Sequence, residues 1–171
     1  SPKVHCWDVK TWEVLRGFKC SGGAASASAS ADGALLAVGG LDGALAVFEL
    51  DSGKRVWDVN GAHGGAVDSL LFLPGGRELA TASSEAGEVR VWSVKSGEKL
   101  WEAKAEAPAL ALVGRDMMLA GSDLRYLAEG RVAAEIKGRA PVAASADGRY
   151  ICTTADDGEP LLWYLPALLW K

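Results

Sequence analysis

The chain has 171 residues, of which 49% are apolar and 23% are charged, and its net charge at pH 7 is −4. This length suits one ordinary domain, and the composition is typical of a packed protein rather than a disordered one. The acidic balance argues against a broad phosphate-binding surface, so we do not expect nucleic acid as the main ligand. No apolar run approaches the roughly 18 residues of a membrane span, and no signal peptide opens the chain, so we expect no membrane partner.

The three cysteines, Cys6, Cys20 and Cys152, lie far apart, and none belongs to a CxxC pair. An odd number of scattered cysteines favours free thiols in a reducing compartment. We therefore expect an intracellular protein, either cytoplasmic or nuclear. One long-range disulfide is the alternative.

The chain is composed of short strand-like segments separated by turn residues, and no window carries a helical apolar stripe of useful length. In chain order, the predicted strands are 4–9 and 12–18; 24–30, 34–39, 44–50 and 54–60; 66–73, 78–83, 88–94 and 98–104; 108–113, 116–120, 124–128 and 131–136; 140–145, 149–154 and 159–165; and an optional last strand at 167–170.

Aromatic residues recur near the end of a strand-like segment with a period of about 40 residues. They are Trp7, Phe48, Trp92 and Trp163, with Tyr126 as a weaker member. Turn signals follow in step, as DSGK at 51–54 and KSGE at 95–98, and KTWE at 10–13 has the same shape with Trp in place of Gly. Four short strands per period are typical of a propeller blade. The pattern therefore predicts an all-β propeller of four-stranded antiparallel blades, with about four blades and two leading strands.

We expect a single propeller segment over residues 1–171. Its parts would be a partial blade at 1–20, blades at 21–61 and 62–105, a short divergent blade at 106–138 and a last blade at 139–171. Sheets must close or be covered to avoid long unpaired edges. Because the chain starts at Ser1 without an initiator Met, we expect the remaining blades in upstream sequence or in another chain. The alternative is that strands 4–18 complete the last blade.

Several motifs occur in one order along the chain. They are WD at 7–8, GAHGGAV at 61–67, LFLPGG at 71–76, LATASS at 79–84, EVRVW at 88–92, KSG at 95–97 and ADDG at 155–158. This order resembles the WD40 family, and the resemblance covers nearly the whole chain, least well from 107 to 138. It implies a propeller of about seven blades that acts as a non-catalytic platform for other proteins.

The resemblance also implies a buried relay of hydrogen bonds in each blade, formed by a His, a Ser or Thr, an Asp and a Trp. The residues assigned to such relays are Thr154, Asp157 and Trp163 of the last blade, Trp92 of the blade at 62–105, and Trp7. We expect no blade to hold all four groups. In the blade at 62–105, Ala86 occupies the Asp position and Glu85 lies one residue away, while His63 supplies the imidazole.

WD40 propellers usually bind partners through the loop before each blade and the loop before each Trp strand. The positions in those loops are His63, Arg139, Asp42, Glu85 and Asp156, which mix both signs of charge. The alternative for each of them is a solvated loop residue without a binding role. For His63, a relay or capping role is the interpretation that we favour over binding.

The sequence carries no recognisable catalytic or metal-binding pattern, so we expect no catalytic residue, no metal and no cofactor. A GxSxG motif is absent, and His5 and Cys6 would point to opposite faces of a strand. The glycine-rich run at 39–43 lacks the Lys-Ser/Thr ending of a phosphate loop.

Trp57 and Trp101 follow DSGKRV and KSGEKL, which also resemble the repeats of quinoprotein dehydrogenases. In that family, such Trp residues lock neighbouring blades together, and we expect this packing role here.

The WD40 resemblance and the lack of a catalytic pattern predict a scaffold for protein–protein interactions within a multiprotein complex. The alternatives are a subunit of a ribonucleoprotein with a local RNA contact and, ranked below it, a quinoprotein-like enzyme.

Overall fold

The computed structural model describes residues 3–105, 109–136, 139–145 and 147–165, with all side chains in these ranges except those of 139–142. These residues form seventeen β-strands and no helix, and the prediction of an all-β fold is confirmed. Each strand matches a predicted one, with bounds that shift by at most three residues. The optional strand at 167–170 lies outside the described residues.

The strands form five antiparallel sheets, which we number in chain order. The first sheet contains β1 (Lys3–Trp7) and β2 (Val14–Lys19), and the second contains β3 (Ala24–Ala29), β4 (Leu35–Gly40), β5 (Leu45–Glu49) and β6 (Arg55–Val59). The third contains β7 (Ser69–Phe72), β8 (Glu78–Ser83), β9 (Glu88–Ser93) and β10 (Lys99–Lys104). The fourth contains β11 (Leu110–Val113), β12 (Met117–Ala120), β13 (Asp123–Tyr126) and β14 (Val132–Glu135), and the fifth contains β15 (Arg139–Ala144), β16 (Tyr150–Thr154) and β17 (Pro160–Tyr164).

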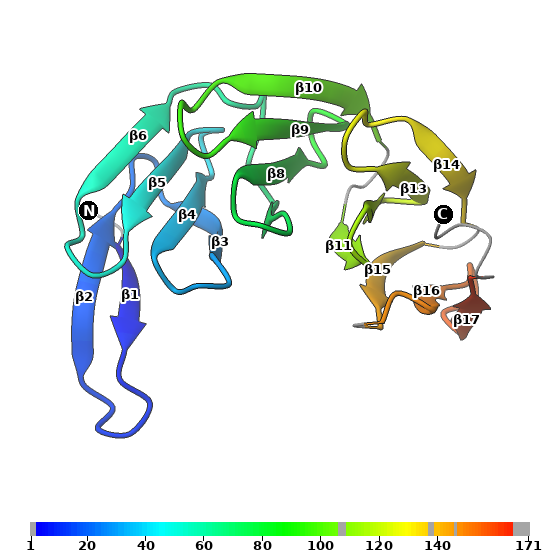
Figure 1. Ribbon diagram of the computed structural model, residues 1–171, viewed down its shortest axis with the longest axis horizontal. Helices are drawn as coiled ribbons and strands as arrows, with labels where there is room; N and C mark the ends of the chain where they lie inside the picture. The colour runs from blue at the N-terminus through cyan, green and yellow to red at the C-terminus, as the bar shows by residue number, and fades with distance from the viewer. Residues whose placement is uncertain (1–2, 106–108, 137–138, 146, 166–171) are drawn as a thin grey trace.

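Within each of the last four sheets, every strand pairs with the strand that follows it in the chain. The first strands of these sheets, β3, β7, β11 and β15, lie next to one another, and the later strands are farther out. The sheets therefore follow one another along an open arc, as Figure 1 shows. This is the arrangement of propeller blades around an axis.

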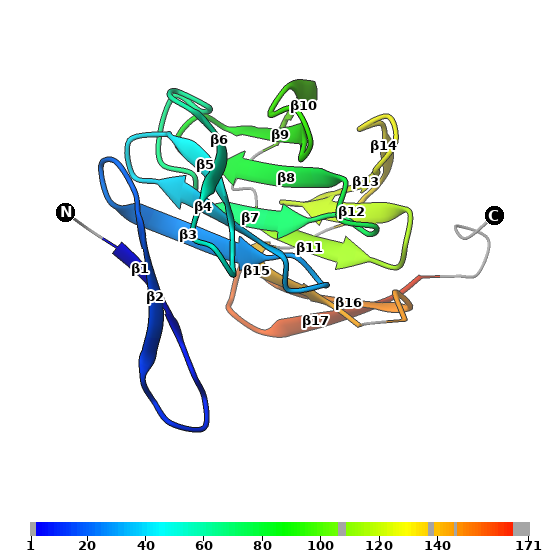
Figure 2. The ribbon, with the colours of Figure 1, turned by 60° about the vertical axis from the view of Figure 1, so that its left-hand side comes forward.

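The first and fifth sheets lie at opposite ends of this arc (Figure 1). Strands β1 and β2 pair with each other and with no other described strand. Figure 2 shows their hairpin projecting beyond the neighbouring sheets. The alternative in which strands 4–18 complete the last blade is therefore wrong for this structure.

Apolar side chains fill the space between successive sheets and form four clusters, one for each junction. Alternating residues of a strand point to opposite faces, so that a central strand serves two clusters. In β9, for example, Trp92 faces the second sheet, whereas Val89 and Val91 face the fourth. Burial of these side chains is the main stabilising contribution, on both faces of the second, third and fourth sheets and on one face of the first and fifth.

Two tryptophans on fourth strands bridge neighbouring sheets. Trp57 of β6 donates its indole N–H to the carbonyl oxygen of Val94 in the third sheet, at 2.7 Å. Trp101 of β10 donates in the same way to Leu127 in the fourth sheet, at 3.2 Å. The prediction that these residues lock successive blades together is confirmed.

Glycines make room for these locking side chains in the turns between third and fourth strands. A Cβ added to Gly97 would lie 3.0 Å from the ring of Trp57, and one added to Gly130 would lie 2.7 Å from the ring of Trp101. At the junction of the first and second sheets, Arg16 takes the same role, since it donates to the carbonyl of Ser52 at 3.0 Å and lies against Gly53. The repeat pattern in the sequence gives no indication that Arg16 has this role.

In the turn between β1 and β2, Trp12 occupies the place that Gly53, Gly97 and Gly130 hold in the turns of the next three sheets. In all four turns this residue donates its N–H to the carbonyl four positions earlier, as Trp12 to Asp8 at 2.8 Å, Gly53 to Glu49 at 2.9 Å, Gly97 to Ser93 at 2.8 Å and Gly130 to Tyr126 at 2.9 Å. All four also have a positive φ, which is 59° for Trp12. A left-handed conformation is unfavourable for a residue with a Cβ, so Trp12 is a strained position.

Candidate functional site

A buried chain of hydrogen bonds lies at the centre of the third sheet. His63 comes from the connection between β6 and β7, Thr81 from β8, and Glu88 and Trp92 from β9. Nε2 of His63 lies 2.7 Å from the hydroxyl oxygen of Thr81, which also accepts the indole N–H of Trp92 at 2.8 Å. Nδ1 of His63 lies 3.1 Å from a carboxylate oxygen of Glu88. All four residues are buried.

The partners of the ring fix the direction of these hydrogen bonds. A carboxylate is only an acceptor, so Nδ1 of His63 carries the proton that it donates to Glu88. Nε2 then accepts from the Thr81 hydroxyl. Burial lowers the pKa of His63 below its ordinary value of 6.5, although the hydrogen bond to Glu88 opposes this shift. The ring is therefore neutral at neutral pH, which suits a structural relay.

Arg90 neutralises the buried carboxylate and ties the relay to the preceding connection. Its guanidinium lies 3.1 Å from Glu88 and donates to the carbonyl of Ala62, next to His63. A buried carboxylate is stable only when its charge and acceptor sites are paired. The acid was expected near position 86 in the turn, but Glu88 in the strand supplies it, so the relay of the third sheet is complete with a Glu in place of the Asp. Glu88, Arg90 and Trp92 are alternate residues of β9 and therefore share one face of the strand. This spacing is the sequence signal that could have identified Glu88 as the acid of the relay.

In the fifth sheet, the indole of Trp163 donates to the hydroxyl of Thr153 at 2.9 Å. The prediction assigned this role to Thr154, which is the adjacent residue on the opposite strand face. Asp157 accepts the backbone N–H of Glu159 at 3.1 Å within its turn. Trp7 is half exposed at the end of β1, where it lies beside the ring of His5 rather than in a buried relay.

The five predicted binding positions divide into three groups. Asp42, Glu85 and Asp156 are exposed, in the loops between the second and third strands of three sheets. His63 is buried in the relay and does not belong to the surface. The side chain of Arg139, at the start of β15, lies outside the described part of the structure.

The loops between second and third strands share one rim of the arc with the connections between sheets, because the sheets repeat the same antiparallel order. The charged residues exposed in the described loops of this rim are all acidic: Asp42, Asp68, Glu85, Asp156, Asp157 and Glu159. No Lys or Arg lies in the described loops 41–44, 60–68, 84–87, 121–122 and 155–159. We call these six residues the acidic rim. The expectation of mixed charge at the five predicted positions depends on Arg139, whose side chain lies outside the described residues.

Contacts between the loops hold part of the acidic rim in place. A carboxylate oxygen of Asp68 accepts the backbone N–H of Ser84 at 2.7 Å and also the hydroxyl of the same residue. Glu85 lies over Gly65, where an added Cβ would come within 2.4 Å of its carboxylate. The connection before the third sheet and the loop before β9 therefore form one surface.

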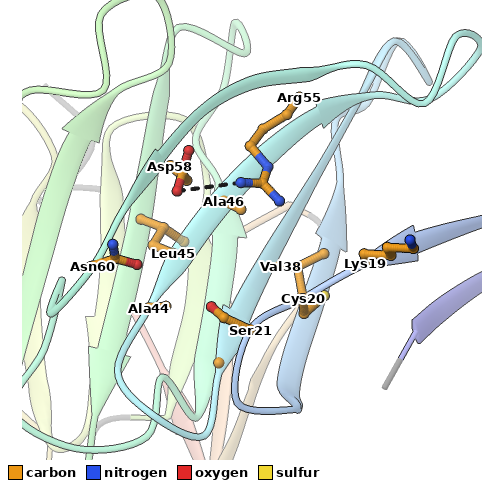
Figure 3. A pocket seen from close by; sticks show the side chains of 11 residues that line it. Lys19, Cys20, Ser21, Val38, Ala44, Leu45, Ala46, Arg55, Asp58 and Asn60 are labelled. Carbon is orange, nitrogen blue, oxygen red and sulfur yellow. Dashed lines mark ion pairs between the residues drawn. The ribbon is translucent and has the colours of Figure 1, made fainter. Parts of the chain in front are cut away.

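A small hollow between the first and second sheets lies beside the rim, as Figure 3 shows. Its lining includes Lys19, Cys20 and Asn60, and Arg55 pairs there with Asp58 at 3.4 Å. Burial raises the pKa of the Cys20 thiol, so this cysteine is not an activated nucleophile. The lining offers polar groups but no paired base and nucleophile.

Other features of the described residues bear on function. Cys6, Cys20 and Cys152 are free thiols. In the ranges that the structure describes, no three or more His, Cys, Asp or Glu side chains lie close enough to hold a metal ion. None of the described segments is a helix long and apolar enough to span a membrane.

Relatives of this chain come from several kinds of protein. It is 31% identical over 101 residues to the small ribosomal subunit protein RACK1z of Oryza sativa subsp. japonica, which is 59% of this chain and 28% of the relative. It is 37% identical over 91 residues to SEC12-like protein 1 of Arabidopsis thaliana, which is 52% of this chain and 23% of the relative. It is 32% identical over 92 residues to U3 small nucleolar RNA-associated protein 12 of Saccharomyces cerevisiae, which is 54% of this chain and 10% of the relative. The chain thus spans about a quarter of the length of the first two relatives.

A solved structure and a family model agree on the fold. A chain in the crystal structure of the mitotic checkpoint complex superposes with a TM-score of 0.81 at 20% identity, over 95% of this chain and 56% of that one. The family model of the anaphase-promoting complex subunit 4 WD40 domain matches residues 26–117, more than half of the chain. Together with the repeated sheets, this match shows that the chain belongs to the WD40-repeat family.

Proposed function

We propose that this chain is a non-catalytic scaffold that binds other proteins through the acidic rim, within a multiprotein complex. The observation that carries the proposal is the acidic charge of the described rim loops, which rigid sheets hold in place. Loops on a fixed scaffold are common binding sites, because the sheets limit the entropy lost when a partner binds. The match to a family model named for a complex subunit supports the same role.

The charge of the rim indicates the chemistry of the partner. Asp42 and Glu85 present carboxylates from the neighbouring second and third sheets, and Asp156 presents one from the fifth, so a partner segment that follows the rim meets several acceptors. Lys and Arg side chains pair with carboxylates, and complementary charge raises both the association rate and the specificity. We therefore propose a basic protein segment as the partner.

A ribonucleoprotein subunit is the second candidate. The observation in its favour is that one relative is named a small ribosomal subunit protein and another a small nucleolar RNA-associated protein. An acidic rim repels phosphate, so any RNA contact would involve another part of the surface. Binding that falls steeply with salt concentration in a filter assay with total RNA would favour this candidate, whereas a retained protein partner and no RNA binding would favour the scaffold.

Two further proposals concern the setting of the chain. The remaining propeller blades come from upstream sequence or from another chain, since the matched residues cover only 28% and 23% of the first two relatives. The protein acts inside the cell, in the cytoplasm or the nucleus, in keeping with the ribosomal and nucleolar names of its relatives.

Charge reversal tests the proposed surface. Tagged wild-type chain is used to capture partners from extracts of its source cells, beside the variant Asp42→Lys/Glu85→Lys. The control is Asp51→Lys/Glu129→Lys, which makes the same change of charge in exposed turns between third and fourth strands, on the opposite rim. We expect the first variant to capture at least about tenfold less partner than the wild type, and the control to capture as much as the wild type. Equal capture by both variants would contradict the proposal.

A further inference from the structure

Two arginines, each on the third strand of its sheet, pair with an acid two residues earlier in the same strand. Arg90 of β9 lies 3.1 Å from Glu88, and Arg125 of β13 pairs with Asp123. Arg125 is only 7% exposed, and the side chain of Arg90 is 20% exposed. A guanidinium with so little exposure is stable only when other groups balance its charge and accept its hydrogen bonds. We call these two acid–arginine pairs the arginine clamps.

Each clamp also reaches a backbone carbonyl outside its own sheet. Arg90 donates to the carbonyl oxygen of Ala62, in the connection between β6 and β7. Arg125 donates to the carbonyl oxygen of Lys104, the last residue of β10 in the preceding sheet, at 2.7 Å. A planar guanidinium has several donors in fixed directions, so it can bind a carboxylate and a carbonyl at the same time. Each clamp therefore holds one peptide group from its carbonyl side.

The N–H of each of these two peptide groups donates to a glycine of a rim loop. The N–H of His63 donates to the carbonyl of Gly43, in the loop between β4 and β5, at 3.1 Å. The N–H of Ala105 donates to the carbonyl of Gly87, in the loop between β8 and β9, at 3.1 Å. In a trans peptide group, the C=O and the N–H point in opposite directions. One peptide group therefore bridges each arginine and the loop of the preceding sheet.

The two loops held in this way belong to the acidic rim, since they carry Asp42 and Glu85. A hydrogen bond to the carbonyl polarises the peptide group and strengthens the bond that its N–H donates. The arginine therefore affects the loop through the backbone, without any contact between the guanidinium and the surface of the rim.

The first of the two loops is packed closely against the connection that Arg90 binds. A Cβ added to Gly43 would collide with the carbonyl oxygen of His63. In the same connection, Val67 donates its N–H to the carbonyl of Gly40 at 3.0 Å, just before the loop. Loop and connection therefore keep one arrangement only as long as the connection itself is held in place.

We infer that Arg90 and Arg125 are positioning residues of the acidic rim. Arg90 holds the loop that presents Asp42, and Arg125 holds the loop that presents Glu85. This inference rests on the proposed function for what the two loops bind, and it adds which residues fix their arrangement. Fixed loops favour binding, because little conformational entropy is lost when the partner docks.

Two matched double variants of the whole chain each remove one clamp and leave every residue of the acidic rim unchanged. They are Glu88→Gln/Arg90→Met and Asp123→Asn/Arg125→Met. Both replace a charged pair by neutral side chains, so neither variant leaves one member of the pair charged and unpaired. The amide oxygen introduced at position 88 can still accept the hydrogen bond from His63. Amide hydrogen exchange is measured residue by residue with NMR, in the absence of any partner.

We expect the amide of His63 to exchange at least about tenfold faster in the first variant, and the amide of Ala105 to stay unchanged. The second variant should show the reverse. The amide of Gly97 donates to Ser93 on the opposite rim and should be unchanged in both variants, so it reports any general loss of stability. Unchanged exchange at His63 and Ala105, or acceleration that all three amides share, would overturn the inference.

Arg90→Lys is the second variant for the third sheet, used if the double variant loses its β-structure in circular dichroism. It keeps a positive charge near Glu88, but its ammonium group lacks the planar fork that binds carboxylate and carbonyl together. The same selective acceleration at His63 is expected. Exchange at this amide equal to that of the wild type would count against the clamp.

Capture of the protein partner is the second readout. Each double variant should capture at least about threefold less partner than the wild type, although no charge of the rim has changed. Full capture by both double variants, together with loss of capture in Asp42→Lys/Glu85→Lys, would overturn the positioning role. Full capture by the charge-reversal variant would instead refute the proposed docking surface, whereas the exchange data would still decide whether the clamps hold the loops.

Discussion

The hydroxyl of Thr81 is the central group of the relay in the third sheet, because it accepts a hydrogen bond from Trp92 and donates one to His63. A hydroxyl can do both at once, whereas an apolar side chain of the same shape can do neither. Removing such a group leaves two buried polar atoms without partners, which costs about 1–3 kcal/mol for each. The relay therefore stabilises the fold and carries no chemical step.

The fifth sheet offers a matched test of the same principle. We expect Thr153→Val to lower the free energy of unfolding by about 1–2 kcal/mol, because the indole N–H of Trp163 loses its acceptor. The neighbouring change Thr154→Val should cost less than about 0.5 kcal/mol. Urea denaturation of both variants measures the difference. A larger loss for Thr154→Val would show that the adjacent hydroxyl is the important one.

His63 should make stability depend on pH. Burial lowers its pKa in the folded state below the value of 6.5, so the unfolded chain binds more protons just below that pH. The free energy of unfolding should fall as the pH drops from about 7 to about 5, and this part of the dependence should be absent in His63→Gln. Asp32 and Asp147 have pKa values lowered from 3.8, so they titrate below this window. Parallel pH profiles for the two proteins would contradict the role of His63.

Trp12 should be a position where a smaller residue improves stability. Its φ of 59° is unfavourable for a side chain with a Cβ, and its side chain is 74% exposed, so little packing is lost on removal. We expect Trp12→Gly to raise the free energy of unfolding by about 1 kcal/mol at concentrations where the chain is monomeric. Trp12→Asn should give a smaller gain, since Asn tolerates this conformation better than Trp. A loss of stability in both variants would mean that the indole packs against the fold.

Individual relay residues were harder to predict from the sequence than the strands that carry them. Thr153 and Thr154 are adjacent, and only the register of β16 against β17 decides which hydroxyl faces Trp163. Glu88 was missed because the expected acid lies in a turn, whereas the carboxylate that reaches His63 starts a strand. Both errors concern side-chain direction, which a motif does not specify.

At the scale of elements, the junctions depend on a large side chain opposite a glycine. Trp57 over Gly97, Trp101 over Gly130 and Arg16 over Gly53 repeat the same contact. The two tryptophans were predictable from their repeat, but Arg16 was not, because Arg shares only its position and its ability to donate a hydrogen bond to a carbonyl. Strand bounds were predicted well because alternation and turn residues are local signals.

A pair of glycine substitutions separates the contact from the backbone conformation. Gly130 and Gly33 both have a positive φ, of 65° and 71°, so alanine at either position costs about 1 kcal/mol for the conformation alone. At Gly130 the added Cβ would also lie 2.7 Å from the ring of Trp101, whereas at Gly33 nothing lies within 4 Å. We expect Gly130→Ala to cost about 2–3 kcal/mol in total, measured by thermal or urea unfolding. Equal costs at the two positions would contradict the lock.

At the scale of the whole molecule, five sheets on an open arc bring loops from distant parts of the sequence to one rim. Asp42, Glu85 and Asp156 are more than forty residues apart in sequence, yet the repeated strand order places them on the same side. The sequence predicted these positions through the resemblance. The burial of His63 could not be foreseen from the sequence alone, because it depends on contacts with β8 and β9.

The most direct test of the proposed docking surface is hydrogen exchange measured on the chain with and without its captured protein partner. We predict that the partner slows exchange in the loops of the acidic rim, at 41–44, 84–87 and 155–159, and leaves the turns of the opposite rim, at 51–54, 95–98 and 128–131, unchanged. Protection confined to the opposite turns, or none in the three rim loops, would contradict it.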